Sequence, residues 1–259
     1  MAGDVKLVTW NVNSIRQRLE RLVALLSRHA PDVVCLQETK TLDGDFPSEA
    51  LRAAGYASIS SGQKSYNGVA ILAKAELSDV AYGFRDGGND EQARLIAATI
   101  DDVRVICAYV PNGQSVGSEK YAYKLEWLER LRKLLDRECD ATRPLALVGD
   151  FNVAPTDADV HDPEAWRGQV LVSEPERAAL RHVLDYGLVD AFRERYPDKV
   201  AFTWWDYRQL GFPKNHGLRI DYMLLTRPLA ARLEDIVIDR EERKGKGASD
   251  HAPVVAVLR

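Results

Sequence analysis

Apolar stretches of strand length alternate with segments of helical periodicity along the chain, and this alternation restricts the fold more than any other feature. Residues 6–12 and 32–38 are apolar runs typical of buried strands. Between them, apolar residues recur at helical spacing, with Ser14 as the expected N-terminal cap and Pro31 as the stop. A strand, a helix and a strand with short connections usually place the two strands in parallel.

The remaining segments extend this alternation. The turn-rich residues 62–68 join two short apolar runs and predict a hairpin. Helices are expected over about 119–139 and 176–185, with an irregular segment at 154–175 before the second. We therefore predict an α/β fold in one domain, 1–259, built as a four-layer sandwich of two packed mixed β-sheets flanked by helices. Further strands are expected at 94–101, 103–111, 144–150, 201–207, 219–226, 233–239 and 252–259.

Composition limits the setting in which the protein works. A chain of 259 residues with 46% hydrophobic content can fill a sizeable core without a disulfide. Cys35 and Cys107 lie in apolar runs and are expected to be buried. No run reaches the roughly 18 apolar residues of a membrane span, and the first ten residues lack the pattern of a signal peptide, which predicts a cytoplasmic protein. A net charge of −4 argues against coating nucleic acid by bulk charge but permits a local basic rim.

Polar side chains follow several of the expected buried strands at the point where each strand ends. Taken singly, an Asn there is typical of a turn, and a His or Tyr of ordinary packing. A carboxylate inside an apolar strand, as at Asp221, is costly unless it is paired or binds metal. Asp150 and Asn152 alternate at the end of a strand, so both are expected on one face. The full set comprises Asn11, Glu38, Tyr109, Asp150, Asn152, Asp221, Asp250 and His251.

The chemistry of this set is uniform. All its members carry oxygen or imidazole donors, and no cysteine is among them. A few hard oxygen ligands suit Mg²⁺, and a histidine beside carboxylates suits acid–base work or charge stabilisation. Together they predict metal-assisted attack of water on a phosphodiester.

Six motifs, in order along nearly the whole chain, carry a family resemblance. They are TWNVNSIR, LQETK, YVPNG, GDFNVAPTD, GLRIDYMLL and SDHAPV. The chain resembles the exonuclease III family of apurinic/apyrimidinic endonucleases, within the superfamily that also holds pancreatic deoxyribonuclease. LQETK and GLRID point to the DNA-repair branch rather than to the phosphatase or sphingomyelinase branches.

The resemblance implies a role for each motif residue. Glu38 resembles the main ligand of Mg²⁺, for which Mn²⁺ could substitute, and Asn11, Asp150, Asn152 and Asp250 would lie at or beside the metal. Asp150 would also be the general base for the attacking water. The remaining catalytic assignments are Tyr109 and Asn152 as contacts of the scissile phosphate, and Asp221 with His251 as a dyad.

The implied substrate is double-stranded DNA with abasic sites or 3′ ends, bound by a monomer. Trp204 and Trp205, with Leu218, are candidate walls of the pocket for the abasic sugar, although one tryptophan could equally belong to the core. The expected DNA contacts are Arg94, Lys124, Trp204, Trp205, Arg208, Leu218 and Arg219.

Two rival functions remain open from the sequence. The same scaffold could serve a phosphatase or phospholipase, because fold does not settle function. A non-catalytic binding protein is the third reading, and the full complement of catalytic positions argues against it.

Overall fold

The computed structural model describes residues 5–88 and 90–259, and its strands form two six-stranded mixed sheets. Residues 1–4, part of the N-terminal stretch inspected for a signal peptide, lie outside the described residues. In order across the first sheet, the strands are β11 (Leu233–Ile238), β12 (Val254–Leu258), β1 (Val5–Asn11), β2 (Val33–Gln37), β4 (Val69–Ala73) and β3 (Ala57–Ser61). Across the second they are β5 (Ser78–Tyr82), β6 (Leu95–Ile100), β7 (Val103–Tyr109), β8 (Leu145–Asp150), β10 (Asp221–Thr226) and β9 (Leu188–Asp190).

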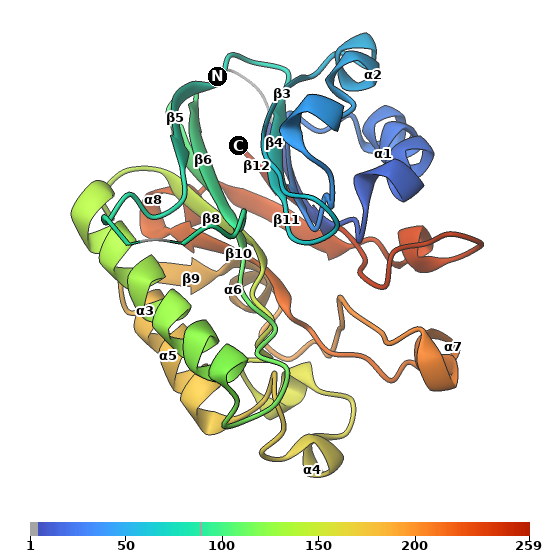
Figure 1. The fold of residues 1–259 in the computed structure, drawn as a ribbon, viewed down its shortest axis with the longest axis vertical. Coiled ribbons are helices and arrows are strands. Elements are labelled where there is room, and N and C mark those ends of the chain that lie inside the picture. The colour runs from blue at the N-terminus through green and yellow to red at the C-terminus, as the bar shows by residue number, and fades with distance from the viewer. Residues whose placement is uncertain (1–4, 89) are drawn as a thin grey trace.

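Helices cover the outer faces of both sheets, which completes the predicted four layers (Figure 1). Helices α1 and α2 pack on the first sheet, and α3 and α5 lie side by side on the second. The helices are α1 (Ile15–His29), α2 (Ser48–Ala53), α3 (Glu119–Glu138), α4 (Pro163–Trp166), α5 (Glu174–Leu184), α6 (Ala191–Arg195), α7 (Gly211–Lys214) and α8 (Arg227–Ala230). Short 3₁₀ turns lie at Asp43–Asp45, Asp157–Asp159, Arg208–Leu210 and Arg240–Arg243.

The core follows from the alternation of side chains along each strand. One face of β1, β2 and β4 meets one face of β6, β7 and β8 in a central layer that contains both Cys35 and Cys107, which are buried as expected. The opposite face of the first sheet carries Trp10 and Leu36 against α1, and that of the second carries Ile106 and Leu147 against α3. Each sheet is therefore apolar on both faces, as sheets covered on both sides require.

Most of the expected pairings are confirmed. Strands β1 and β2 are parallel, β3 and β4 form the predicted antiparallel pair, and so do β6 and β7. Ser14 stands at the start of α1, but the predicted side-chain cap is wrong, because its hydroxyl makes no cap hydrogen bond. Its backbone has φ of 93°, and its amide donates instead to the carbonyl of Glu38 at 2.7 Å.

The strand predicted at 201–207 is wrong. In this segment Trp204 makes isolated bridges to Leu218 and His251 rather than a ladder. The hydroxyl of Thr203 accepts from the amides of Ile220 and Asp221, at 3.0 and 3.1 Å. The Thr203 hydroxyl therefore holds the backbone where β10 begins.

Candidate active site

Strand direction brings the predicted site residues to one rim of the sandwich. The parallel pair β1 and β2 and the parallel pair β7 and β8 end at this rim, whereas the antiparallel strands β10 and β12 begin there. Tyr109 is the register partner of Asp150, and Asp150 that of Asp221. Groups from both sheets therefore converge, although they are far apart in sequence.

Asn11 links the two carboxylates that come from different sheets. Its Nδ2 donates to Oε1 of Glu38 at 2.8 Å and to Oδ2 of Asp150 at 2.9 Å. Its Oδ1 accepts from the amide of Asn13 at 3.0 Å. Asn11 thus presents its amide nitrogen to the two carboxylates and holds them together, and its place at or beside the metal stays a prediction.

Asp150 and Asn152 lie together through a turn rather than through strand alternation. Strand β8 ends at Asp150, and Asn152 is left-handed with φ of 51°. The amide of Asn152 donates to Oδ1 of Asp150 at 2.9 Å, which is an Asx turn. The Asn152 side chain donates to the carbonyl of Val110 at 3.0 Å and accepts from Asn112 at 3.3 Å. The predicted proximity is correct, but its cause is a turn.

His251 lies between two carboxylates. Its Nδ1 is 2.9 Å from Oδ2 of Asp221, and its Nε2 is 3.8 Å from Oδ2 of Asp150. Burial lowers the pKa of His251, but the charges of Asp221 and Asp150 outweigh it and raise the pKa to about 10. Burial, with Asp221 and Glu38, raises the pKa of Asp150 to about 7 against the opposing effect of His251. The expected Asp221–His251 pair is present, with a cationic imidazole.

Tyr109 completes this side of the rim. Its side chain is buried, and the Arg94 guanidinium lies 4.5 Å from the centre of its ring. Burial and the nearby Glu38 carboxylate raise the pKa of Tyr109 well above its usual value, so the hydroxyl stays protonated and can donate.

The donor set fits a hard divalent cation. Glu38, Asp150 and His251 each offer one ligand atom within 4.8 Å of the others. The raised pKa of His251 keeps its ring protonated, so the carboxylates of Glu38 and Asp150 are the usable ligands. Asp250 lies outside this group among the described residues. Its Oδ1 accepts from Asn13 at 2.9 Å and its Oδ2 from Trp204 at 3.1 Å, and its place at or beside the metal stays a prediction.

Four of the expected DNA contacts are interior residues. Lys124 and Trp205 are fully buried, as is Leu218, and Arg219 is 1% exposed. The Lys124 ammonium pairs with Glu176, and Trp205 packs edge-on against Phe212 at 5.1 Å. The open question about the tryptophan pair is thereby answered, since Trp205 belongs to the core.

Arg219 belongs to a buried charge network. Its guanidinium pairs with Asp159 and Asp190, each at 2.7 Å, and lies 4.7 Å from the ring centre of Tyr222. Lys124, Trp205, Leu218 and Arg219 therefore cannot contact DNA in this structure, because their side chains are buried. Arg94, Trp204 and Arg208 keep accessible surface.

Two residues near the site were missed in the sequence. Lys40 pairs with Oε2 of Glu38 at 2.9 Å and donates to Oδ1 of Asn13 at 2.5 Å. Its position directly after the LQET residues could have indicated it. Thr203, whose hydroxyl holds the backbone of Asp221, has no comparable signal because its partner lies 18 positions away.

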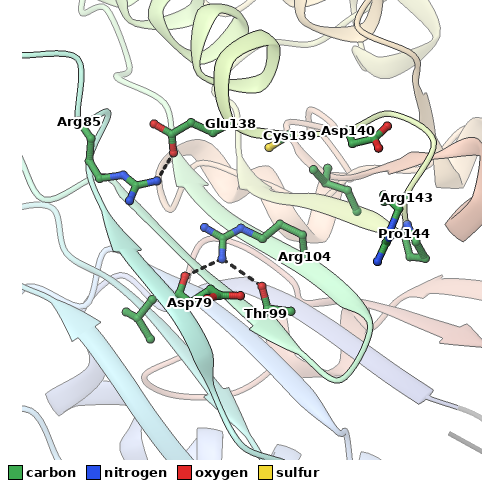
Figure 2. Close-up of a pocket in the computed structure, with 11 residues that line it drawn as sticks. Asp79, Arg85, Thr99, Arg104, Glu138, Cys139, Asp140, Arg143 and Pro144 are labelled. Carbon is green, nitrogen blue, oxygen red and sulfur yellow. Dashed lines mark hydrogen bonds and ion pairs between the residues drawn. The ribbon is translucent and has the colours of Figure 1, made fainter.

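A cavity of about 550 Å³ lies at the other end of the second sheet (Figure 2). Arg104 donates there to the carbonyl of Asp79 at 2.7 Å, and Arg85 pairs with Glu138. Arg104 and Leu145 belong to the starts of β7 and β8, whose far ends carry Tyr109 and Asp150. The cavity is therefore separate from the polar rim.

Comparison with known proteins agrees with this geometry. Residues 8–251 match the model of the Endonuclease/Exonuclease/phosphatase family. The chain is 36% identical to exodeoxyribonuclease III of Haemophilus influenzae, over 97% of this chain and 99% of that one.

Solved structures are similar over almost the whole chain. A 3′ phosphatase from Neisseria bound to a product DNA hairpin is 42% identical, with a TM-score of 0.96 and coverage of 98% and 99% of the two chains. An AP endonuclease from Archaeoglobus fulgidus is 41% identical, with a TM-score of 0.95 and the same coverage. The chain therefore belongs to the endonuclease/exonuclease/phosphatase family, as a phosphodiester-hydrolysing nuclease of the exodeoxyribonuclease III type.

Proposed function

We propose that this protein is a Mg²⁺-dependent DNA-repair nuclease that cuts the phosphodiester 5′ to abasic sites and trims 3′ ends of duplex DNA. One observation carries the proposal. Glu38, Asp150 and His251, from three separate segments, offer ligand or proton-transfer atoms within 4.8 Å of one another. Oxygen ligands beside a protonated imidazole suit hydrolysis of an anionic ester.

Asp150 acts as the general base. It is buried, its Oδ1 is held by the Asn152 amide, and its Oδ2 is held by Asn11. The pKa raised to about 7 makes its carboxylate a better acceptor for the proton of the attacking water than an ordinary aspartate. The water oxygen forms the new bond to phosphorus, and its proton passes to Asp150.

His251 stabilises the charge that develops on the phosphate. Asp221 holds Nδ1 and keeps the ring cationic, so the Nε2–H is left to donate toward the reacting group. Tyr109 and Asn152 add neutral donors beside it. The bond from phosphorus to the 3′ oxygen breaks, and this oxygen takes up a proton from solvent, which leaves a 3′-hydroxyl and a 5′ deoxyribose phosphate at an abasic site.

Glu38 would hold the Mg²⁺ ion with Asp150, and Mn²⁺ would fit the same oxygens. When bound, the ion neutralises phosphate charge and favours departure of the leaving oxygen. Lys40 lies 2.9 Å from Glu38 and supplies a positive charge on the same side. Asn11 hydrogen-bonds to both carboxylates that would hold the ion and so keeps Glu38 and Asp150 close together.

Duplex DNA would lie across the rim near Arg94, Trp204 and Arg208. The 3′ phosphatase from Neisseria is bound to a product DNA hairpin in its solved structure, which supports a DNA substrate for this chain. No helix among residues 5–88 and 90–259 is long and apolar enough to cross a membrane. A single catalytic domain, a monomeric state and a cytoplasmic location are the remaining parts of the proposal.

A direct assay tests the function. A duplex oligonucleotide with one tetrahydrofuran abasic analogue is incubated with and without Mg²⁺, beside duplexes with 3′-phosphate and recessed 3′ ends. Mg²⁺-dependent nicking 5′ to the analogue or release of 3′ phosphate and nucleotides is expected. Turnover of an inositol phosphate or sphingomyelin with intact DNA would instead establish the phosphatase or phospholipase alternative.

A further inference from the structure

The side chain of Lys124 is fully buried, and the proposed mechanism gives its ammonium no role. It lies on α3, and all three of its donors have acceptors. They bind the carbonyl of Asn152 at 2.6 Å, the carbonyl of Asn112 at 3.1 Å and Oε1 of Glu176. An ammonium has three N–H groups, so its hydrogen-bonding capacity is filled.

Its two carbonyl acceptors belong to the loops that carry the reaction groups. Asn112 follows β7, which ends at Tyr109, and Asn152 follows β8, which ends at Asp150. The side chain of Asn112 also donates to Oδ1 of Asn152 at 3.3 Å. The ammonium therefore links these two loops, because it donates a hydrogen bond to one carbonyl in each.

Glu176 fixes the ammonium from the opposite side. Its Oε1 also accepts from the amide of Leu171 at 3.0 Å, and its Oε2 accepts from the amide of Ser173 at 3.1 Å. Ser173 and Glu176 form the capping box of α5, so the ammonium is held by a helix start that is itself fixed.

Stability alone gives a weak reason for this arrangement. A buried ion pair commonly contributes no more than well-packed apolar residues of the same volume, because both charges lose their hydration. Asn152 has a left-handed backbone with φ of 51°, and such residues persist where the surroundings hold them. A cation that binds the Asn152 carbonyl supplies that constraint.

We infer that Lys124 is a positioning residue, whose ammonium binds the carbonyls of Asn112 and Asn152 and so fixes Asn152 and the Asx turn on Asp150 in their reactive geometry. This inference rests on the proposed roles of Asp150 and Asn152. It also replaces the expected phosphate contact by Lys124 with an action through the backbone.

The kinetic test measures steady-state kcat and KM of the whole 259-residue chain on the tetrahydrofuran duplex. Lys124→Met removes the ammonium, Lys124→Arg keeps a cation, and Lys124→Met/Glu176→Gln removes both charges. Leu131→Ala is the matched control, because it removes a buried core side chain from the same helix but no hydrogen bond to either loop. Urea unfolding of each variant measures its stability.

We expect Lys124→Met and the double variant to lower kcat by about 10- to 100-fold with KM unchanged, as loss of a supporting contact or a small misplacement does. Lys124→Arg should recover part of kcat, and Leu131→Ala should keep kcat despite its lower stability. Equal kcat values for Lys124→Met and Leu131→Ala would overturn the inference. A raised KM with normal kcat would overturn it in favour of a phosphate contact.

A second measurement separates this inference from the proposed function. Amide hydrogen exchange at Asn152 reports the hydrogen bond to Asp150 without any substrate. Faster exchange at Asn152 in Lys124→Met than in Leu131→Ala is expected. If the wild-type protein cut no DNA, the proposed function would fall, and unchanged exchange at Asn152 would independently overturn the positioning role.

Discussion

Asp150 and Asp221 are register partners on the neighbouring antiparallel strands β8 and β10. Two carboxylates directly opposite one another repel, and both are buried here. His251 resolves the conflict, since its Nδ1 lies 2.9 Å from Asp221 and its Nε2 3.8 Å from Asp150. The three residues therefore form one electrostatic unit, in which the pKa values of Asp150 and His251 are each shifted by the charges of the other two residues.

Loss of the general base should abolish most turnover and spare binding. Asp150→Asn keeps the size of the side chain and removes its ability to take a proton. We expect kcat to fall by about 10²–10⁴-fold or more while the affinity for duplex DNA stays near the wild-type value. Single-turnover cleavage and fluorescence anisotropy measure the two quantities. A near-normal rate would show that another group accepts the proton.

Glu38 should control the metal requirement. Glu38→Gln removes the charge and keeps the shape, so the Mg²⁺ concentration for half-maximal activity should rise by about 10- to 100-fold or more. The measurement is a Mg²⁺ titration of the cleavage rate. Glu49→Gln, an exposed change on α2, is the control. An unaltered Mg²⁺ dependence in Glu38→Gln would reject this residue as the ligand.

The high-pH limit of activity should report the charge of His251. The reaction needs the protonated ring, whose pKa is raised to about 10, so the rate should fall as pH rises through that value. Asp221→Asn removes the largest favourable charge effect and should move this fall to lower pH. Rates on the tetrahydrofuran duplex, measured from about pH 6 to beyond the pKa of about 10, test this. If the rate of Asp221→Asn falls at the same high pH as that of the wild-type protein, Asp221 does not raise the pKa of His251.

The same pair should affect stability in a defined pH window. The folded-state pKa of His251 is above its ordinary value of 6.5, so the stabilising contribution is complete below about pH 6.5 and is lost as pH rises through about 10. Urea unfolding of the wild-type protein and Asp221→Asn should therefore differ most at the low end of this window. A difference that grows with pH would contradict the assignment.

Substitution of Arg219 should lower stability, whereas substitution of Arg208 should weaken DNA binding. Arg219→Met breaks a buried network, and the free energy of unfolding should drop by about 3–5 kcal/mol. Arg208→Met alters an exposed side chain, so stability should change by less than about 0.5 kcal/mol. Its DNA affinity should weaken, with the salt slope reduced by about 1. Urea unfolding and salt-dependent anisotropy measure both, and the reverse pattern would refute the placement.

Local sequence patterns predicted much of the fold and several residues of the candidate site. Apolar periodicity predicted the parallel β1–α1–β2 unit, the paired strands and the long helix α3, because burial of one face imposes that periodicity. The polar residues at strand ends identified Glu38, Asp150, Asp221 and His251, since carboxylates have few reasons to follow buried strands. Each of these signals is a local pattern, which is read from one strand or helix and the few residues beside it.

Tertiary structure decided which charges face water and which face protein. Lys124 and Arg208 are both basic residues near the motifs, yet one is fully buried against Glu176 and the other is exposed. Asp250 accepts a hydrogen bond from Asn13, 237 positions away, and lies outside the group of Glu38, Asp150 and His251 in the described residues. The packing of the two sheets brings such a charged side chain to its partner, which lies far away in the sequence. Whether the charge is buried or solvated therefore depends on this partner rather than on the neighbouring residues in the chain.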